Sequence, residues 1–320
     1  MRVRLVTPAP RGSRAGNRAS ANRWAAILRR LGHRVKVSTD YHGEPADLMV
    51  GLHAWRSADA IARFDAAYPD RPLVVVLTGT DAYRFIHSHR ETTLASLDVA
   101  DHIVGLHALV GNVLPERLRG KLRVIVQSAR PMQHRQPARR SFRVCFAGHL
   151  REEKDPLRPA LAVRGLPPES RIRVDAYGGA HADDWAAAEE EMRINPRYRW
   201  HGEIPHAELR RVYSRSHLLV LPSVIEGGAN VISEAVMAGL PVIASDIEGS
   251  VGLLGQDYPG YYPVQDTVAL RERLLLAESD DGYYAGLVAA CAARRQLFMP
   301  QQEHAGWEKL LEDIQASAVA

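Results

Sequence analysis

The sequence predicts an α/β protein made of two Rossmann-like, doubly wound domains. Its 320 residues exceed what one hydrophobic core comfortably organises, since domains average about 150 residues. Short β-branched runs alternate with segments of helical periodicity, which is typical of a parallel sheet covered by helices. This alternation is interrupted at residues 128–141 and then restarts.

The first domain, residues 1–134, begins with a strand at 3–7 and a long basic loop, "PAPRGSRAGNR". Apolar residues then recur at the spacing of one helical face, and Gly32 stands where a helix C-cap belongs. That face consists of Trp24, Ile27, Leu28 and Leu31. Apolar runs predict five further strands, at 34–38, 47–52, 73–78, 102–106 and 122–127.

The segment at 128–141, "SARPMQHRQPARRS", shows no periodicity and is expected to be an interdomain linker. The second domain, residues 140–298, has six expected strands, at 142–148, 171–179, 197–202, 217–223, 241–245 and 260–264. Its helices are expected near 155–164, 181–194, 205–215, 229–238, 266–278 and 282–297. A last helix at 301–317 is expected to pack back on the first domain. Two such domains would leave a ligand cleft between the carboxyl ends of their sheets.

Composition excludes several classes of protein. No apolar run approaches the roughly 20 residues of a membrane helix, and the hydrophobic fraction of 46% is ordinary. Cys145 and Cys291 are far apart, so neither a disulfide scaffold nor a zinc site is expected. A buried strand at the start, without an apolar signal segment, favours the cytoplasm. The alternative is a transit peptide, because residues 1–39 are rich in arginine and free of acids.

The basic charge is unevenly placed. Ten Arg or Lys precede the first acid, Asp40, which predicts a positive field on one face of the first domain. The net charge of +4 does not by itself indicate nucleic-acid binding, which would need basic residues interleaved with stacking aromatics. We therefore expect no nucleic-acid partner and no membrane partner.

The stretch "LVLPSVIEGGANVISEAVMAGLPVIAS" (219–245) has the parts of a mononucleotide pocket. Gly227 and Gly228 follow a buried strand and let the backbone approach a ligand. The helix near 229–238 offers its N-terminal amides to a phosphate. Asn230 and Glu234 share one helix face, so Glu234 can accept a hydrogen bond from a sugar hydroxyl beside the phosphates. The alternative is that Glu226 and Glu234 are acids stabilised by the helix dipole.

The spacing from Glu226 to Glu234, followed by "AVMAGLPVIAS", resembles the E-x7-E segment of family 4 glycosyltransferases with the GT-B fold. This resemblance implies that Glu234 holds the donor ribose and Glu226 the transferred sugar. It also implies that backbone amides in this segment bind the diphosphate. The donor-binding residues expected here are Glu226, Gly227, Gly228, Ala229, Asn230, Val231 and Glu234.

A second element, "FAGHLREEKDP" (146–156), resembles the family loop that carries an arginine and a lysine to the diphosphate. Lys154 matches the lysine, whereas His149 stands where the family has its arginine, so charge stabilisation there depends on pH. Arg151 could substitute for that arginine. The resemblance also places Ile204 against the nucleobase. A solvated loop of mixed charge is the alternative for 146–156.

The acceptor side is expected in the first domain. The basic loop corresponds to the family's glycine-bearing loop, and its cations around a helix N-terminus suit a small anionic acceptor. A solvated basic loop is the alternative. The residues expected to bind the acceptor are Arg11, Gly12, Arg14, Gly16, Asn17, Arg18, Thr78, Thr80 and Arg84. Asp81 either faces the same site or caps the next helix. His53 stands close to the position at which this family often has a cleft histidine, and the alternative is a structural histidine.

Taken together, "VTPAPRGSRAGNR", "LTGTDAYR" and "FAGHLREEKDP" resemble the selenosugar synthases of selenoneine biosynthesis. That likeness implies transfer of a hexose from UDP-glucose or UDP-N-acetylglucosamine to selenophosphate, without a metal ion. The expected catalytic residues are His53, Asp81, Lys154 and Glu226. Three alternatives remain: an ordinary family 4 transferase with a hydroxyl acceptor, a GT-B sugar-nucleotide epimerase, and a non-catalytic nucleotide-sugar binder.

Overall fold

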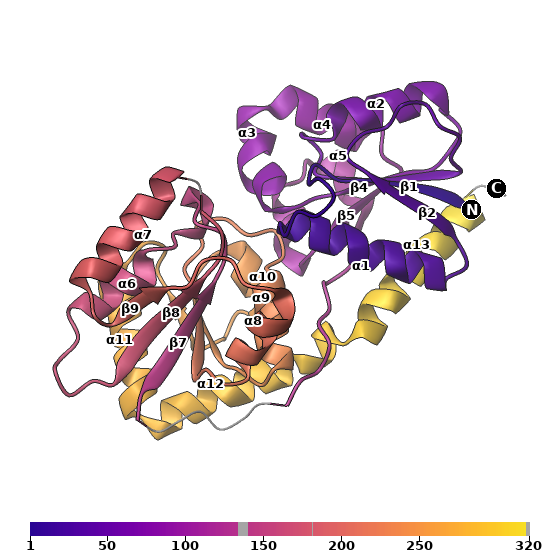
Figure 1. Cartoon of the computed structure of the whole chain (residues 1–320). Helices are drawn as coiled ribbons and strands as arrows, with labels where there is room; N and C mark the ends of the chain where they lie inside the picture. Colours follow the sequence, from indigo (N-terminus) through magenta and orange to yellow (C-terminus); the bar gives the residue numbers. More distant parts are fainter. Residues whose placement is uncertain (134–139, 181, 318–320) are drawn as a thin grey trace. The chain divides into compact units, whose positions relative to one another are not determined.

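The computed structural model describes residues 1–133, 140–180 and 182–317, and it confirms the α/β class. The chain divides into two compact units, drawn in Figure 1: unit 1 comprises Met1–Gln127 and Pro300–Ala320, and unit 2 comprises Ser128–Met299. The first part of the expected linker belongs to unit 2, where Ala129 N–H donates to the Phe298 carbonyl. The part of the expected linker at 134–139 lies outside the described residues.

Unit 1 contains a parallel six-stranded sheet in the order β2-β1-β3-β4-β5-β6. The chain reverses direction of winding between β1 and β3, and ligands of doubly wound sheets bind beyond the carboxyl ends of the strands at such a point. The strands are β1 Arg2–Val6, β2 Arg34–Ser38, β3 Leu48–Leu52, β4 Leu73–Val76, β5 His102–Gly105 and β6 Leu122–Val124.

The helices of unit 1 pack on this sheet. They are α1 Gly16–Arg30, α2 Ala58–Ala67, η1 Asp81–Phe85, α3 Ile86–Ser88, α4 Arg90–Asp98, η2 Ala108–Val113, α5 Glu116–Arg119 and α13 Pro300–Ser317. α1 ends as its sequence predicts: Gly32 has φ 87°, and the amides of Gly32 and His33 donate to the carbonyls of Arg29 and Leu28. This is a Schellman motif, which requires a left-handed residue and therefore favours glycine.

Unit 2 contains a second parallel six-stranded sheet, in the order β12-β11-β10-β7-β8-β9. Its strands are β7 Phe142–Ala147, β8 Ile172–Tyr177, β9 Tyr198–Trp200, β10 Leu218–Leu221, β11 Val242–Ser245 and β12 Tyr261–Tyr262. Reading from β7, this is the strand order of a dinucleotide-binding Rossmann sheet. The winding reverses between β7 and β10, so a ligand is expected beyond their carboxyl ends.

The helices of unit 2 agree with the sequence-based expectations to within a few residues. They are η3 Glu152–Lys154, α6 Arg158–Arg164, α7 Ala182–Ile194, α8 His206–Tyr213, α9 Asn230–Met237, α10 Glu248–Leu254, α11 Thr267–Ser279, α12 Asp281–Ala293 and η4 Arg295–Phe298. α10 was not anticipated. Residues 260–264 shorten to the two-residue strand β12, and 282–297 divide into α12 and η4.

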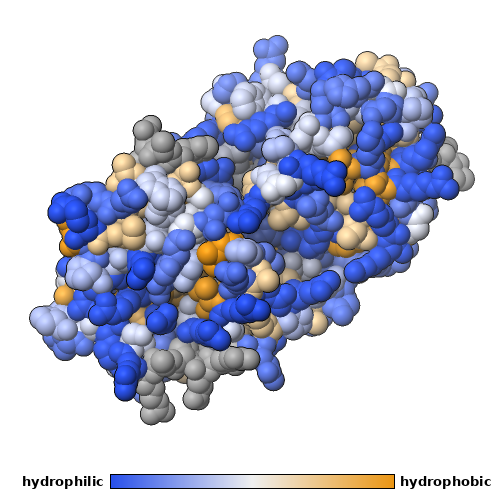
Figure 2. All heavy atoms as spheres, viewed as in Figure 1, coloured by the Kyte–Doolittle hydropathy of each residue, from blue (hydrophilic) through white to orange (hydrophobic). Residues whose placement is uncertain are grey.

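The surface in view is mostly polar. Figure 2 shows hydrophilic residues over most of it, with hydrophobic residues in small separate groups. Within the described residues, no helix is both long enough and apolar enough to cross a bilayer.

Candidate functional site

The winding reversal of unit 2 brings together the two loops that carry the expected donor-binding residues. One loop follows β7 and includes Lys154, and the other follows β10 and includes Glu226. The Glu153 carbonyl joins them, because it accepts hydrogen bonds from the backbone N–H groups of Val224 (2.9 Å) and Ile225 (3.4 Å). The sheet order thus places two segments that are distant in the sequence side by side.

Lys154 and Glu226 form an ion pair at this point. Lys154 Nζ lies 2.5 Å from Glu226 Oε1, and the Ser223 hydroxyl donates to the same oxygen at 2.7 Å. Glu226 is only 6% exposed, so its carboxylate depends on these partners. An ammonium group and a carboxylate side by side can bind a phosphate oxygen and a sugar hydroxyl respectively. Residue spacing alone does not predict this direct contact.

The turn from Glu226 into α9 is tightly packed. Ala229 is the N-cap residue of α9, and its methyl side chain cannot accept a hydrogen bond from the first turn. Opposite this turn, a Cβ atom added to Gly249 would lie 2.2 Å from the Glu226 carbonyl oxygen. Because only glycine allows so close an approach, the start of α10 helps to fix Glu226.

The remaining donor-binding candidates lie around this turn. Gly227 is buried, and Gly228, Asn230 and Val231 are partly exposed. Ile204 is also partly exposed and precedes Pro205, the N-cap residue of α8.

Glu234 lies in the middle of α9 and contacts a residue that sequence reasoning missed. His206 Nε2, at the start of α8, lies 2.8 Å from Glu234 Oε1. Burial raises the pKa of Tyr213 well above its usual value, and the charge of nearby Glu234 raises it further. Helical periodicity does not specify how α8 and α9 align, so the sequence could not identify His206 as a partner.

His149, which replaces the family's arginine, is held as a neutral ring. Its pKa is lowered mainly by burial and next by the charge of Arg151, which is itself exposed. The Gly179 N–H donates to its Nδ1 at 3.2 Å. In the neutral ring the proton therefore sits on Nε2, which remains a donor. His149 can donate a hydrogen bond to a phosphate but does not supply the permanent charge of an arginine.

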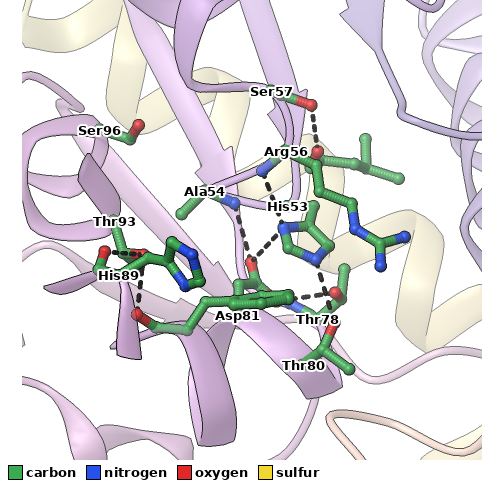
Figure 3. Close-up of polar contacts among 12 residues, drawn as sticks. His53, Ala54, Arg56, Ser57, Thr78, Thr80, Asp81, His89, Thr93 and Ser96 are labelled. Carbon is green, nitrogen blue, oxygen red and sulfur yellow. Dashed lines mark hydrogen bonds and ion pairs between the residues drawn. The ribbon is translucent and has the colours of Figure 1, made fainter. Parts of the chain in front are cut away.

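In unit 1, His53 follows β3 beside the winding reversal, and Figure 3 shows its polar contacts. Its backbone conformation is unusual. It has φ 73°, a left-handed conformation that is uncommon in residues other than glycine and costs energy. Its side chain is 1% exposed, and burial is the main cause of its lowered pKa. The Arg56 N–H donates to Nδ1 (3.2 Å), so Nε2 carries the proton and donates to Thr80 Oγ1 (3.0 Å).

Asp81 connects the loops after β3 and β4. It is fully buried and accepts hydrogen bonds from the Ala54 N–H (2.8 Å), the Thr78 N–H (2.7 Å) and the Thr78 hydroxyl (2.7 Å), as Figure 3 shows. The alternative that Asp81 caps the next helix is wrong, because its carboxylate turns back to these donors. It begins the π-helical segment η1, a rare conformation that is frequent at functional sites.

The basic loop between β1 and α1, together with the first turn of α1, contains most of the other acceptor-binding candidates. Gly12 has φ 86°, and Gly16 is the first residue of α1. Arg11 and Arg14 are exposed. Arg18 Nε is buried and has no hydrogen-bond partner within the described residues, which is unusual for a charged group.

The last two acceptor-binding candidates are half-buried. Asn17 lies in the first turn of α1, and Arg84 lies in η1.

Neither metal-binding clusters nor reactive thiols were found in the described part of the chain. No three His, Cys, Asp or Glu side chains gather there as metal ligands. Cys145 and Cys291 are both buried as free thiols, and burial raises the pKa of Cys145 to about 12.

Solved structures with a similar fold cover nearly the whole chain. HepE of Anabaena, crystallised with UDP, has a TM-score of 0.75 at 16% identity, over 98% of this chain and 100% of that protein. Sucrose-phosphate synthase of Thermosynechococcus elongatus has a TM-score of 0.78 at 16% identity, over 98% and 99% of the two chains. At this identity the similarity establishes the fold, which is the GT-B arrangement of two Rossmann-like domains.

Sequence comparison connects the chain to a family. D-inositol 3-phosphate glycosyltransferase of Corynebacterium glutamicum is 31% identical over 127 residues, which cover 35% of this chain and 30% of that protein. The chain thus matches less than a third of this curated relative. The model of the family "Glycosyl transferases group 1" matches residues 131–290, which include both loops of the donor-site candidate. The chain therefore belongs to the group 1 glycosyl transferases.

Proposed function

We propose that the protein transfers a hexose from a UDP-sugar, with the donor bound in unit 2. The observation that carries this proposal is the Lys154–Glu226 pair (2.5 Å) at the winding reversal, beside the N-terminus of α9. The similar HepE protein has been crystallised with UDP and with UDP-glucose, which supports a uridine nucleotide. The donor is UDP-glucose or UDP-N-acetylglucosamine.

Each donor-site group has a distinct task in this proposal. Lys154 and the amides at the start of α9 stabilise the negative charge that develops on the departing diphosphate. Neutral His149 donates a hydrogen bond through Nε2, and exposed Arg151 adds positive charge. Glu226 accepts hydrogen bonds from the transferred sugar, and Glu234 accepts them from the ribose. Because these groups supply the required charge, the reaction proceeds without a metal ion.

The proposed acceptor is selenophosphate, bound in unit 1. Supporting this choice, the loop between β1 and α1 carries Arg11 and Arg14, and the first turn of α1 carries Arg18. The buried Arg18 Nε still has the capacity to donate a hydrogen bond. The name of the related D-inositol 3-phosphate glycosyltransferase also specifies a phosphate-bearing compound. Selenium attacks the anomeric carbon, the bond from that carbon to the UDP oxygen breaks, and UDP leaves. Water then attacks phosphorus, the phosphorus–selenium bond breaks, and orthophosphate leaves while selenium stays on the sugar as a selenol.

In this scheme, His53 and Thr80 together present a hydrogen-bond donor to the bound selenophosphate. The His53 ring donates to Thr80 Oγ1, which leaves the threonine hydroxyl hydrogen available to an anionic oxygen. Asp81, fixed by three donors, holds both loops in place. Because both carboxylate oxygens of Asp81 already accept hydrogen bonds, Asp81 is better suited to positioning the loops than to transferring a proton.

The test is to incubate the protein with each UDP-sugar, with and without selenophosphate, in the presence of a chelator. We expect release of UDP and a selenium-bearing sugar by mass spectrometry only when selenophosphate is present. Arg14→Ala is expected to raise the KM for selenophosphate while leaving the affinity for UDP unchanged. Equal effects on both substrates would contradict the assignment of donor and acceptor to different units.

A second candidate is transfer to a phosphorylated polyol hydroxyl, which the same arginines and the name of the curated relative favour. The same assay with inositol 3-phosphate distinguishes the two acceptors. UDP release with this compound, and none with selenophosphate, would reject the selenosugar proposal and retain the glycosyltransferase.

A further inference from the structure

Three adjacent strands of unit 2 each place an arginine on one face of the sheet. Arg143 in β7 and Arg173 in β8 are paired across the sheet, and Arg199 in β9 is paired with Asp175 in β8. All three arginines are exposed. In Figure 1, β7 and β8 face the viewer and no helix crosses in front of them. This part of the sheet is therefore open, although doubly wound sheets are usually covered on both faces.

The arginines surround a cavity. Its volume is about 480 Å³, and the charged residues that line it are Arg143, Arg173, Arg197, Arg199 and Asp175. This volume falls in the range of small-molecule sites, roughly 300–1,000 Å³. Arg143 and Arg173 are each the second residue of their strand, whereas the donor loops follow the carboxyl ends. The cavity is thus distinct from the proposed donor site.

Positive charge in the cavity is only partly balanced. Asp175 is shared between His201 (2.7 Å) and Arg143 (3.7 Å). Arg197 is occupied by the carbonyls of Ser170, Ile172 and Pro167.

Among the residues that the structure describes, the other two arginines leave most of their N–H donors without an acceptor. Arg173 Nη1 donates to the Pro196 carbonyl (2.9 Å), and no other acceptor is found there. Neither Arg173 nor Arg199 has an ion pair within the described ranges.

Like charges on paired residues of neighbouring strands destabilise a sheet. An exposed face that nevertheless keeps Arg143 opposite Arg173 gains stability when an anion lies between them. Guanidinium groups match the geometry of phosphate oxygens, and a concave site of this volume suits a small molecule. We propose that this cavity is a second ligand site, which binds a small phosphorylated molecule.

Pyrophosphate titration by calorimetry tests the site. We expect binding to the unaltered protein with UDP present in excess, which keeps pyrophosphate from the donor site. Arg173→Gln/Arg199→Gln should weaken this binding by at least about tenfold, because two guanidinium groups that donate charge-assisted hydrogen bonds to the anion are lost. Arg295→Gln, which removes an exposed arginine elsewhere in unit 2, is the matched control and should bind normally.

Thermal unfolding gives an independent readout. Without anions, Arg173→Gln should unfold at a higher temperature than the unaltered protein, because a like-charge pair is relieved. Pyrophosphate should then stabilise the unaltered protein more than the variant. The proposal is overturned if the double variant binds pyrophosphate as well as the control does, if no heat is observed, or if only anionic vesicles or single-stranded RNA bind. Lys154→Gln should still bind pyrophosphate in this cavity, because Lys154 belongs to the donor site. An error in the donor-site assignment would therefore not affect this test.

Discussion

At the scale of single residues, the two carboxylates of the candidate donor site differ in their partners. Glu226 is held by Lys154 and Ser223, whereas Glu234 contacts the largely exposed His206. Glu234→Ala removes the proposed ribose acceptor and should weaken UDP binding by about tenfold or more, measured by calorimetry. His206→Ala is the matched control, because it releases Glu234 without removing the carboxylate. Weaker binding in His206→Ala alone would contradict the role given to Glu234.

His53 should make stability depend on pH. Its folded pKa lies below the ordinary 6.5 because burial disfavours the charged ring, so the unfolded chain binds more protons between the two values. The stabilisation from a neutral His53 is therefore complete above about pH 6.5 and is lost as pH falls towards the folded pKa. His53→Asn tolerates the left-handed backbone and cannot titrate. Denaturant unfolding below pH 6.5 should show a shallower loss of stability in this variant; an unchanged slope would exclude His53 as a contributor.

His149 allows the effects on stability and on UDP binding to be separated. Burial also lowers the pKa of its half-buried ring, so His149→Asn should flatten the same part of the pH profile. Unlike His53→Asn, however, it should also weaken UDP binding. A pair of variants with the same effect on both stability and UDP binding would contradict the separate sites assigned to the two histidines.

At the scale of secondary-structure elements, the close packing of α10 against the Glu226 turn predicts that a larger residue at position 249 displaces this turn. Gly249→Ala places a Cβ atom 2.2 Å from the Glu226 carbonyl oxygen, so the turn must shift. We expect lower thermal stability and weaker UDP binding. Gly286→Ala, in α12 with no atom near the added Cβ, should instead stabilise by roughly 0.5–1 kcal/mol. Equal Tm values in the two variants would show that α10 is not fixed as described.

Most secondary-structure elements could be predicted from the sequence, whereas the contacts between them could not. Apolar runs and the face containing Trp24 and Leu28 predicted the main strands and α1, because burial periodicity is local information. The contacts of Lys154 with Glu226 and of Glu234 with His206 depend on strand order and helix alignment, which no local pattern encodes. α10 was missed because Glu248–Leu254 is short and contains two glycines, which lower helix propensity.

At the scale of the whole molecule, unit 1 is assembled from both ends of the chain. α13 contributes Trp307, Leu310, Leu311 and Ile314 to the core cluster that contains Trp24. The rings of Trp24 and Trp307 are 5.4 Å apart. Fully buried Glu303 accepts hydrogen bonds from Trp24 Nε1 (2.7 Å) and Arg23 Nε (3.0 Å). The first 127 residues therefore lack part of their own core.

This arrangement predicts that residues 1–127 fold stably only together with α13. Alone, they would expose the apolar face of α1 and leave Trp24 Nε1 without its acceptor, so we expect aggregation or a molten state in circular dichroism and thermal unfolding. Residues 1–127 joined to 300–320 by a flexible linker should unfold cooperatively, because the missing core and Glu303 are restored. In that chain Trp307→Ala should cost about 3–5 kcal/mol, whereas the exposed Glu308→Ala should cost little. If residues 1–127 alone unfolded cooperatively, at the same temperature as the joined chain, α13 would not be part of the core that stabilises unit 1.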